Sequence, residues 1–345
     1  MGCHVGTNLF AVILKQVVYF REKSYWRLIL KFASDQYARI SDFSKQQLTR
    51  KFSMQFAYGH REILLNYSKV DLSSLLIGVL QHGVGPTFTL YSDWPTPRYR
   101  GLGRSNLWVY SKKAVIDLAS EGVKNVSAIG SPWLYSKVLH GYSARKSSQK
   151  MKFLVFPRHY SFSYLSKITP LDILEKIQYW KSIAGSEQLE ICLYWSEFLD
   201  PVWQQVAREE GVSLVCAGIT QTTPVWSLSD SRIDFYVNLR NIIDSATHCI
   251  FESFTSAIFY ACDLKKNVGI FQNSSSLEEV NRSSAFQQED QWLFKNVPKI
   301  FNSCESSSDL DAITFELLGY DEMLSPEILS NILKYRSGII PKQLG

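Results

Sequence analysis

The 345-residue chain lacks several patterns that mark well-known classes of protein. Its six cysteines show no Cys-x-x-Cys spacing and several fall within apolar stretches, so the sequence favours reduced, buried thiols over a disulfide scaffold or a zinc site. No apolar run reaches the ~18 residues that a membrane-spanning helix needs. The apolar start, Val5 to Phe20, carries Lys15 and lacks the order of basic, apolar and small-residue segments that signal peptides have.

Net charge is also small, but it is unevenly distributed along the chain. The total of +5 is too low to indicate nucleic-acid binding by itself, and no nucleic-acid-binding module accompanies it, so we expect no nucleic-acid partner. Between Lys15 and Arg61, however, ten Lys and Arg residues stand against three Asp and Glu, with aromatic residues interleaved. Two interpretations of residues 15–61 stay open: a helix pair with a solvated basic face, or a surface that contacts anionic membrane or an anionic acceptor.

What the sequence does contain is an alternation of apolar strands and helical patterns. The 46% hydrophobic and 14% aromatic content excludes wholesale disorder. Strand-like runs occupy residues 75–80, 107–110, 126–129, 153–156, 189–195, 212–216, 248–251 and 268–271. Helical patterns occupy residues 112–121, 171–183, 201–210, 257–262, 309–318 and 326–335. Such alternation predicts an α/β fold with parallel sheets.

The stretch from Tyr142 to Lys150 is polar, has no apolar period and is the best candidate for a linker. It separates two α/β halves of ~150 residues each, a common domain size. We therefore predict an N-terminal domain over residues 1–145, with a basic helical start, and a C-terminal domain over residues 146–322. Residues 323–345 are expected to form a helix that returns to pack on the first domain.

Polar turns follow several of the predicted strands, at the edge where open parallel sheets bind ligands. In the first half these turns are Gln81-His82-Gly83 and Gly130-Ser131-Pro132. In the second half they are Pro157-Arg158-His159 and the segment from Glu252 to Ser256 (ESFTS). A long loop in the first half, residues 91–104, is rich in Pro, aromatic residues and Arg. Long loops of this kind are often functional.

The order and spacing of these turns resemble those of GT-B glycosyltransferases, over about residues 75–335. The likeness is greatest to bacterial capsule, polysialic-acid, Kdo and glycerol-phosphate transferases, which have an HG-type turn, a GSP-like turn, a basic or His-Pro turn and a Ser/Thr pair before a helix. The resemblance implies two facing Rossmann-like domains with a C-terminal helix that returns to the first. The chain departs from the pattern at Pro157-Arg158-His159, which is similar but not identical, and at Phe254, which interrupts the Ser/Thr pair.

The resemblance also implies roles for the residues in these turns. His82 is expected to be a base or an acceptor contact, and Arg158 and His159 to stabilise the leaving phosphate. Donor contacts are expected from Gly130, Ser131, Glu252, Ser253, Thr255 and Ser256. Contacts with an anionic acceptor are expected from Arg98, Arg100 and Arg104. Structural interpretations stay open beside these: a histidine that satisfies its own turn, a Ser/Thr helix cap, and an ion pair of Glu252 at a domain interface.

No Asp-x-Asp motif follows a buried strand. Asp309-Leu310-Asp311 has that spelling, but it lies in a polar, Ser-rich stretch with helical character. We therefore expect a metal-independent reaction and no bound cofactor, with the nucleotide sugar as co-substrate.

The sequence thus predicts a cytoplasmic glycosyltransferase, acting at the inner face of the cytoplasmic membrane. It would move a sugar from a nucleotide-activated donor to an anionic or lipid-linked acceptor of a capsule, a lipopolysaccharide or another surface polysaccharide. Two alternatives on the same fold stay open. One is a nucleotide-sugar epimerase or hydrolase that needs no acceptor, and the other is a non-catalytic GT-B-like subunit of a polysaccharide assembly complex.

Overall fold

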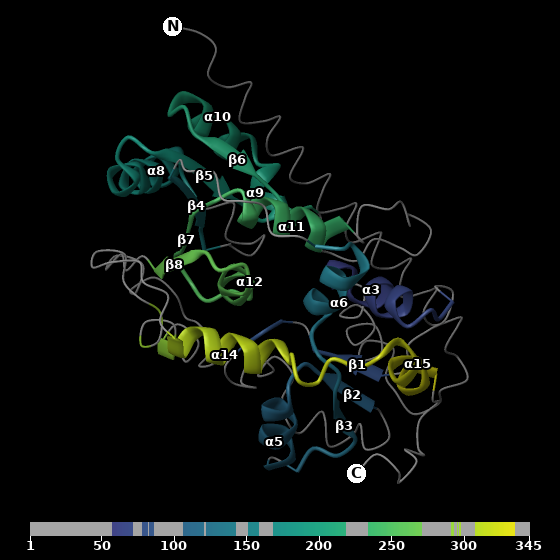
Figure 1. The fold of residues 1–345 in the computed structure, drawn as a ribbon. Coiled ribbons are helices and arrows are strands. Elements are labelled where there is room, and N and C mark those ends of the chain that lie inside the picture. The colour runs from purple at the N-terminus through teal and green to yellow at the C-terminus, as the bar shows by residue number, and fades with distance from the viewer. Residues whose placement is uncertain are drawn as a thin grey trace, which may run out of the picture.

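Two parallel β-sheets organise the protein (Figure 1). The structure is a computed structural model, and every statement below concerns the residues that it describes. These are residues 57–71, 78–81, 83–85, 106–120, 122–142, 151–158, 168–218, 234–270, 291–292, 295, 297 and 308–334. We refer to residues 57–142 as the first unit and to residues 151–270 as the second unit.

The first unit contains a three-stranded sheet with the order β1-β2-β3. Its strands are β1 (Gly78–Leu80), β2 (Asn106–Val109) and β3 (Val126–Ala128), and both neighbouring pairs are parallel. Its helices are η1 (Ala57–Gly59), α3 (His60–Tyr67), α5 (Lys112–Ser120) and α6 (Pro132–Leu139). Helix α3 packs directly against α6.

The second unit contains a five-stranded sheet with the order β6-β5-β4-β7-β8, in which every neighbouring pair is parallel. Its strands are β4 (Lys152–Phe156), β5 (Gln188–Cys192), β6 (Ser213–Val215), β7 (His248–Phe251) and β8 (Asn267–Ile270). Counted within the sheet this is the order 3-2-1-4-5 of a Rossmann fold. The chain adds strands on one side of β4 as far as β6 and then on the other side from β7 onward. Sheets of this kind bind ligands in the crevice at that switch in strand order.

Helices cover both faces of the second sheet, because successive residues of a strand point to opposite sides. In β4, Phe153 and Val155 join the apolar cluster formed with α8 (Pro170–Ala184) and α10 (Pro201–Glu209). The alternate residues, Leu154 and Phe156, join the larger cluster formed with α11 (Asp234–Asp244) and α12 (Ala257–Asp263). Both faces of β4 are therefore apolar, as its continuous hydrophobic sequence predicts.

Local signals fix where the helices of the second unit begin. Helix α8 starts with a capping box, in which Thr169 Oγ1 accepts from the Asp172 N–H and the Asp172 carboxylate accepts from the Thr169 N–H. At α10 the Asp200 carboxylate accepts from the Val202 N–H at 2.9 Å. Both helices also have proline at the first turn, where its missing N–H costs nothing.

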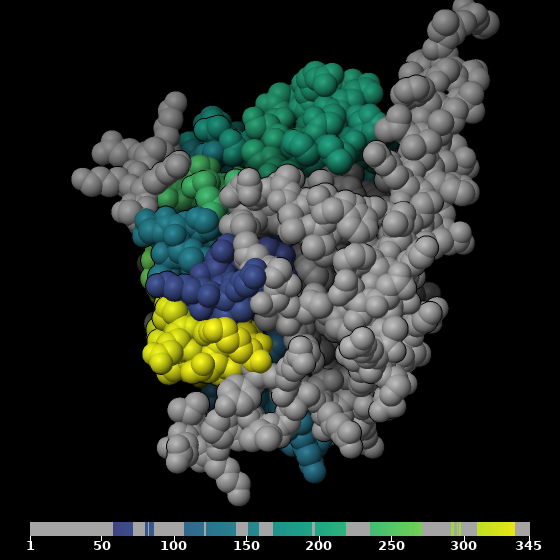
Figure 2. Space-filling view, turned by 90° about the vertical axis from the view of Figure 1, so that its right-hand side faces the viewer, coloured from purple at the N-terminus to yellow at the C-terminus, as the bar shows by residue number. Residues whose placement is uncertain are grey.

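The C-terminal helices join the two units. Helix α14 (Ser308–Leu318) packs on α12 of the second unit and on α5 of the first, and α15 (Pro326–Lys334) packs on α3. Figure 2 shows the second of these contacts at the surface, with α15 in yellow directly against α3. The predicted fold class is confirmed: α/β, GT-B, with two facing Rossmann-like parts and a C-terminal helix that returns to the first. None of the described helices is both long enough and apolar enough to cross a membrane.

Several elements differ from the sequence-based expectation. The strand predicted over 189–195 ends at Cys192, because the chain turns after it and enters α9 (Trp195–Phe198). Helix α6 was not predicted, since Pro132 to Ser136 are all buried and a helix buried all round has no amphipathic period. The sequence shows a short amphipathic run at Leu239, Ile242, Ile243 and Ala246, and α11 extends from Asp234 to Asp244. The domain boundaries at residues 145 and 322 stay predictions; the first of them lies in residues 143–150, outside the described part.

The turn after α14 gives a testable prediction. Gly319 has a φ of +71°, and a Cβ added there would overlap the carbonyl oxygen of Tyr110. We expect Gly319→Ala to lower the free energy of unfolding by more than ~3 kcal/mol, because the left-handed conformation costs ~1–2 kcal/mol and the overlap adds to it. Urea denaturation measures the change.

Gly122→Ala is the matched control for that substitution. Gly122 has a similar φ of +79°, but nothing lies within 4 Å of the added Cβ. It should therefore lose only the ~1–2 kcal/mol of the backbone conformation. Equal losses in the two variants would contradict the packing of Gly319 against Tyr110.

Candidate functional site

A cavity of about 170 Å³ lies at the carboxyl ends of the second sheet and is lined by both units. The second unit contributes residues that follow β4, β5, β6 and β7, together with residues of α11 and α12. The first unit contributes Tyr58 and Gly83. The cavity therefore sits where the strand order reverses, between β4 and β7, and faces the first unit.

The described walls of this cavity carry no charge, and aromatic side chains are their largest group. The aromatic lining residues are Tyr58, Phe156, Tyr194, Phe235, Tyr236, Phe254 and Tyr260. Hydroxyl and thiol groups come from Ser253, Thr255, Ser256, Cys192 and Cys216. Such walls suit a flat, uncharged group that stacks on rings and forms hydrogen bonds with hydroxyls. The volume is below the ~300–1,000 Å³ of sites that enclose a whole drug-sized ligand, so the cavity fits one part of a larger ligand.

The Ser/Thr-rich turn lies in the wall of the cavity, as the sequence predicts. Ser253, Thr255 and Ser256 all line it. The Ser256 hydroxyl also reaches the first unit, where it accepts from the Val84 N–H at 2.9 Å and lies 3.3 Å from the Val84 carbonyl oxygen. A Cβ added to Gly83 would lie only 2.8 Å from Ser256 Oγ, so this close approach of the two units requires glycine.

Glu252 lies beside the cavity and is not one of its lining residues. Its carboxylate accepts from the Arg158 backbone N–H at 3.1 Å and forms an ion pair with Lys176 at 2.8 Å. Pro157, immediately before Arg158, does line the cavity. Glu252 therefore fixes the turn that presents Arg158 at the edge of the cavity, and its ion pair lies within the second unit.

Gly130 and Ser131 are not brought to the cavity. The Gly130 N–H donates to the Tyr110 carbonyl at 3.0 Å, and the Ser131 N–H donates to the Leu318 carbonyl at 2.9 Å. Ser131 is completely buried. The connection between α14 and α15 covers this end of β3, and the turn predicted to touch the donor instead anchors that connection.

Several predicted residues lie outside the described part of the chain: His82, His159, Arg98, Arg100 and Arg104. The roles predicted for these residues, and for the basic segment before residue 57, are therefore not tested by the structure. The neighbours of His82 are nevertheless well defined. Gln81 is buried, donates to the Gly83 carbonyl at 2.7 Å and accepts from the Tyr110 N–H at 2.8 Å. Gln81 and Gly83 are therefore joined by a hydrogen bond, and Gly83 lines the cavity.

A chain of buried hydroxyls beneath the cavity was not predicted from the sequence. His60 Nε2 lies 2.7 Å from Tyr236 Oη, which lies 3.3 Å from Tyr260 Oη, and Tyr260 in turn hydrogen-bonds with Ser256. Burial raises the pKa of Tyr260 to about 12, although its hydrogen bonds with Tyr236 and Ser256 lower it in part. Both tyrosines are on helices, where a buried aromatic residue looks like any other core residue. No sequence signal separates them from the core.

Other lining residues carried a signal that could have been used. Tyr194 and Cys216 lie at the carboxyl ends of the predicted strands 189–195 and 212–216, so the rule that ligands bind at carboxyl ends points to them. Cys192, Cys216, Cys249 and Cys262 are free thiols, in agreement with the expectation from spacing. Burial raises the pKa of Cys216, which disfavours its thiolate form.

The Asp309-Leu310-Asp311 segment is helical, as predicted, and lies in the first turn of α14. Asp311 pairs with Lys265 at 2.9 Å. Within the described residues, no three His, Cys, Asp or Glu side chains are grouped so that they could hold a metal ion.

Comparisons with known proteins add little to this geometry. No protein-family model matches the chain, and no curated protein sequence matches it. Among solved structures, the chain is similar to S. aureus MnaA with UDP, at 14% identity over 77% of this chain and 67% of that chain, with a TM-score of 0.35. It is also similar to the UDP-GlcNAc 2-epimerase from Neisseria meningitidis bound to UDP-GlcNAc (14% identity, 75% and 70% covered, TM-score 0.34) and to TarM (10%, 74% and 48%, 0.29). At these scores the similarities assign neither an activity nor a ligand.

The contact between Gly83 and Ser256 can be tested by a double-mutant cycle. Gly83→Ala forces a methyl group onto Ser256 Oγ and should cost ~1–3 kcal/mol of stability, while Ser256→Ala should cost ~1 kcal/mol for the lost hydrogen bond. The double variant should be more stable than the sum of these losses predicts, because the colliding oxygen is gone. Urea denaturation of the four proteins measures the coupling. Strict additivity would contradict the contact.

Tyr260 gives a pH prediction. Its pKa is raised from 10.0 to about 12 in the folded protein, so the native state keeps a proton that the unfolded chain has lost over this interval. Its contribution to stability is complete below pH 10 and is lost as the pH rises towards 12. We expect Tyr260→Phe to show a smaller fall in the free energy of unfolding across this range than the wild type. An identical fall in both proteins would contradict the assignment.

Proposed function

We propose that the cavity binds part of a nucleotide sugar and that the protein transfers the sugar to an acceptor. The observation that carries this proposal is the place of the cavity: at the reversal point of a parallel sheet of order 3-2-1-4-5, facing a second parallel sheet. Sheets of this kind bind nucleotides at that crevice. The resemblance of the turns to GT-B glycosyltransferases supports the same ligand class.

The chemistry of the walls supports a division of the ligand. The uncharged, aromatic cavity suits the base or the sugar, which stack on rings and hydrogen-bond with the hydroxyls of Ser253 and Thr255. The phosphates need positive charge, and Arg158 follows Pro157 at the edge of the cavity. A guanidinium there would neutralise the leaving phosphate with paired donors. Its backbone is already held by Glu252, so little ordering is left for the binding step.

The acceptor side is proposed from the first unit. His82, next to Gly83 at the cavity, is the proposed base or acceptor contact, and Arg98, Arg100 and Arg104 are proposed to bind an anionic or lipid-linked glycan. With the basic residues of 15–61, these arginines favour a place at the inner face of the cytoplasmic membrane. The transfer is proposed to need no metal ion.

A nucleotide-sugar epimerase or hydrolase is the second candidate. Its reaction needs the donor alone, and the described walls of the cavity, at about 170 Å³, account for a part of the donor and for no acceptor contact. Such an enzyme uses the same donor contacts but completes its reaction without a second substrate.

The test is a panel of nucleotide sugars with product analysis, with and without glycan acceptors and in the presence of EDTA. Arg158→Ala should lower the rate of nucleotide release by at least ~10²-fold, because it removes charge stabilisation of the leaving phosphate. His82→Ala should lower it by a similar factor if it is the base. Arg208→Ala, an exposed arginine on α10, is the matched control and should leave the rate unchanged.

The outcomes separate the candidates. Sugar transfer that requires an acceptor supports the transferase, and an epimerised or hydrolysed donor without acceptor supports the second candidate. Nucleotide-sugar binding with no turnover on any donor would indicate a non-catalytic subunit of an assembly complex. If calorimetry shows no binding of any nucleotide or nucleotide sugar, the proposal is wrong.

A further inference from the structure

Helix α12 belongs to the second unit by sequence, but it contacts the first unit just before its start, at Tyr260 and at its end. Every residue from Ala257 to Cys262 is buried. Just before the helix, Ser256 holds the backbone of Val84. In its middle, the Tyr260 ring stacks on the Trp133 ring of α6, with centroids 4.3 Å apart and planes 14° apart. At its end, Asp263 contacts α6 again.

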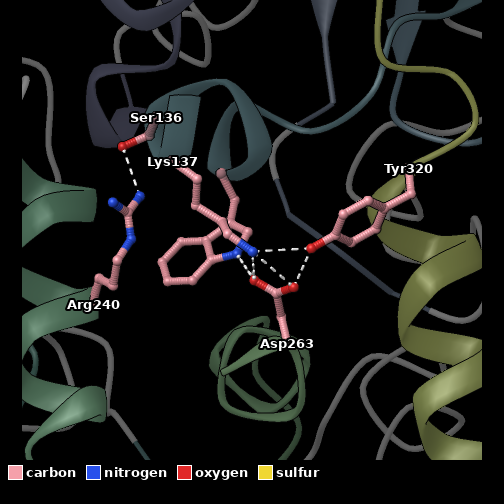
Figure 3. Close-up of polar contacts among 6 residues, drawn as sticks. Ser136, Lys137, Arg240, Asp263 and Tyr320 are labelled. Carbon is pink, nitrogen blue, oxygen red and sulfur yellow. Dashed lines mark hydrogen bonds and ion pairs between the residues drawn. The ribbon is translucent and has the colours of Figure 1, made fainter. Parts of the chain in front are cut away.

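The Asp263 carboxylate is the centre of a buried polar cluster (Figure 3). Its side chain is only 5% exposed. Oδ2 accepts from Trp133 Nε1 at 2.6 Å and from Lys137 Nζ at 2.9 Å, and Oδ1 accepts from the Tyr320 hydroxyl. Lys137 Nζ also lies 3.0 Å from the Tyr320 oxygen. Three segments meet here: α6 of the first unit, α12 of the second, and the connection between α14 and α15.

Helix α11 strengthens the same junction from its other side. Arg240 lies over the Trp133 ring at 5.1 Å and donates to Ser136 Oγ at 3.1 Å, as Figure 3 also shows for the second contact. Arg240 also lies over the ring of Tyr142, at 5.1 Å. Tyr142 is the first residue of the predicted linker and the last one described, so Arg240 of the second unit contacts the chain where that linker begins.

We propose that α12 holds the two units together, so that they unfold as one cooperative unit. The Asp263 carboxylate makes the central contact of this interface. Separating the units would break the ion pair between Asp263 and Lys137 and the stacking of Trp133 on Tyr260. Breaking a buried ion pair is strongly unfavourable. Interfaces between domains of one chain are usually polar and allow relative motion, and the buried cluster prevents it here. The units neither unfold independently nor swing apart about the linker, and a ligand enters the cavity while they stay joined.

Amide hydrogen exchange at a series of urea concentrations tests this proposal. If the two units open separately, their amides begin to exchange at different urea concentrations, which we call their midpoints. In the wild type, the slowest amides of β2 and β3 should share one midpoint with those of β4 and β5. The Val84 amide, which donates to Ser256, should share it too. Asp263→Asn should separate the midpoints of the two sheets by about 1 M urea, since it removes the buried charge that pairs with Lys137.

Two further variants make the test decisive. Tyr320→Phe removes one hydroxyl from the cluster and keeps the ring that stacks on Phe315, so it should fold and give a smaller separation. Glu190→Gln is the matched control, because it removes an ion pair with Lys152 inside the second unit. If the two units unfold together, Glu190→Gln lowers the urea midpoints of both sheets by the same amount.

The proposal is overturned if the two sheets of the wild type exchange at different midpoints, or if the Val84 amide exchanges well below both. It is also overturned if the midpoints stay coincident in the cluster variants. Should Asp263→Asn fail to fold, the wild type and Tyr320→Phe decide the outcome. The test does not depend on the proposed function, since it uses neither a nucleotide nor a turnover assay.

Discussion

A buried carboxylate needs donors on all sides, and that requirement at Asp263 ties the structure together. The donors come from segments far apart in sequence: Trp133 and Lys137 on α6, and Tyr320 after α14. Each is in place only when its own unit has folded, so the cluster satisfies the carboxylate only in the complete molecule. The C-terminal connection that supplies Tyr320 is positioned in turn by Gly319, whose close packing on Tyr110 tolerates no side chain.

The cavity depends on the same interface between the units, because α12 contributes residues to both. Its end bears Asp263, and the turn before its start bears Ser253, Thr255 and Ser256 in the cavity wall. Between them, Tyr260 both lines the cavity and stacks on Trp133. A shift of the helix would therefore change the interface and the cavity together. The Glu252 carboxylate holds the backbone of Arg158, immediately after Pro157 in the cavity wall.

The placement of the turns shows how far a sequence can locate a site. The turns at Gly83, Pro157 and 253–256 do meet at one cavity, because parallel strands bring their carboxyl ends to one edge and the two edges face each other. The turn at Gly130 and Ser131 obeys the same rule and still fails to reach the cavity, since the chain after α14 covers it. Glu252 follows a strand as well, but its carboxylate turns to Lys176 and the Arg158 backbone. Which turns stay open is a property of what packs on them.

The sequence by itself determined the local and periodic features of this protein. Continuous apolar runs specified buried parallel strands, caps and prolines specified where α8 and α10 begin, and the order of elements specified two α/β halves with a returning helix. Only the tertiary structure decided the partners of buried polar groups. Nothing local indicates that Asp263 meets Trp133, or that Tyr236 joins His60 to Tyr260, because these contacts link residues 24 to 176 positions apart. Their geometry exists only after the two sheets have packed around α12.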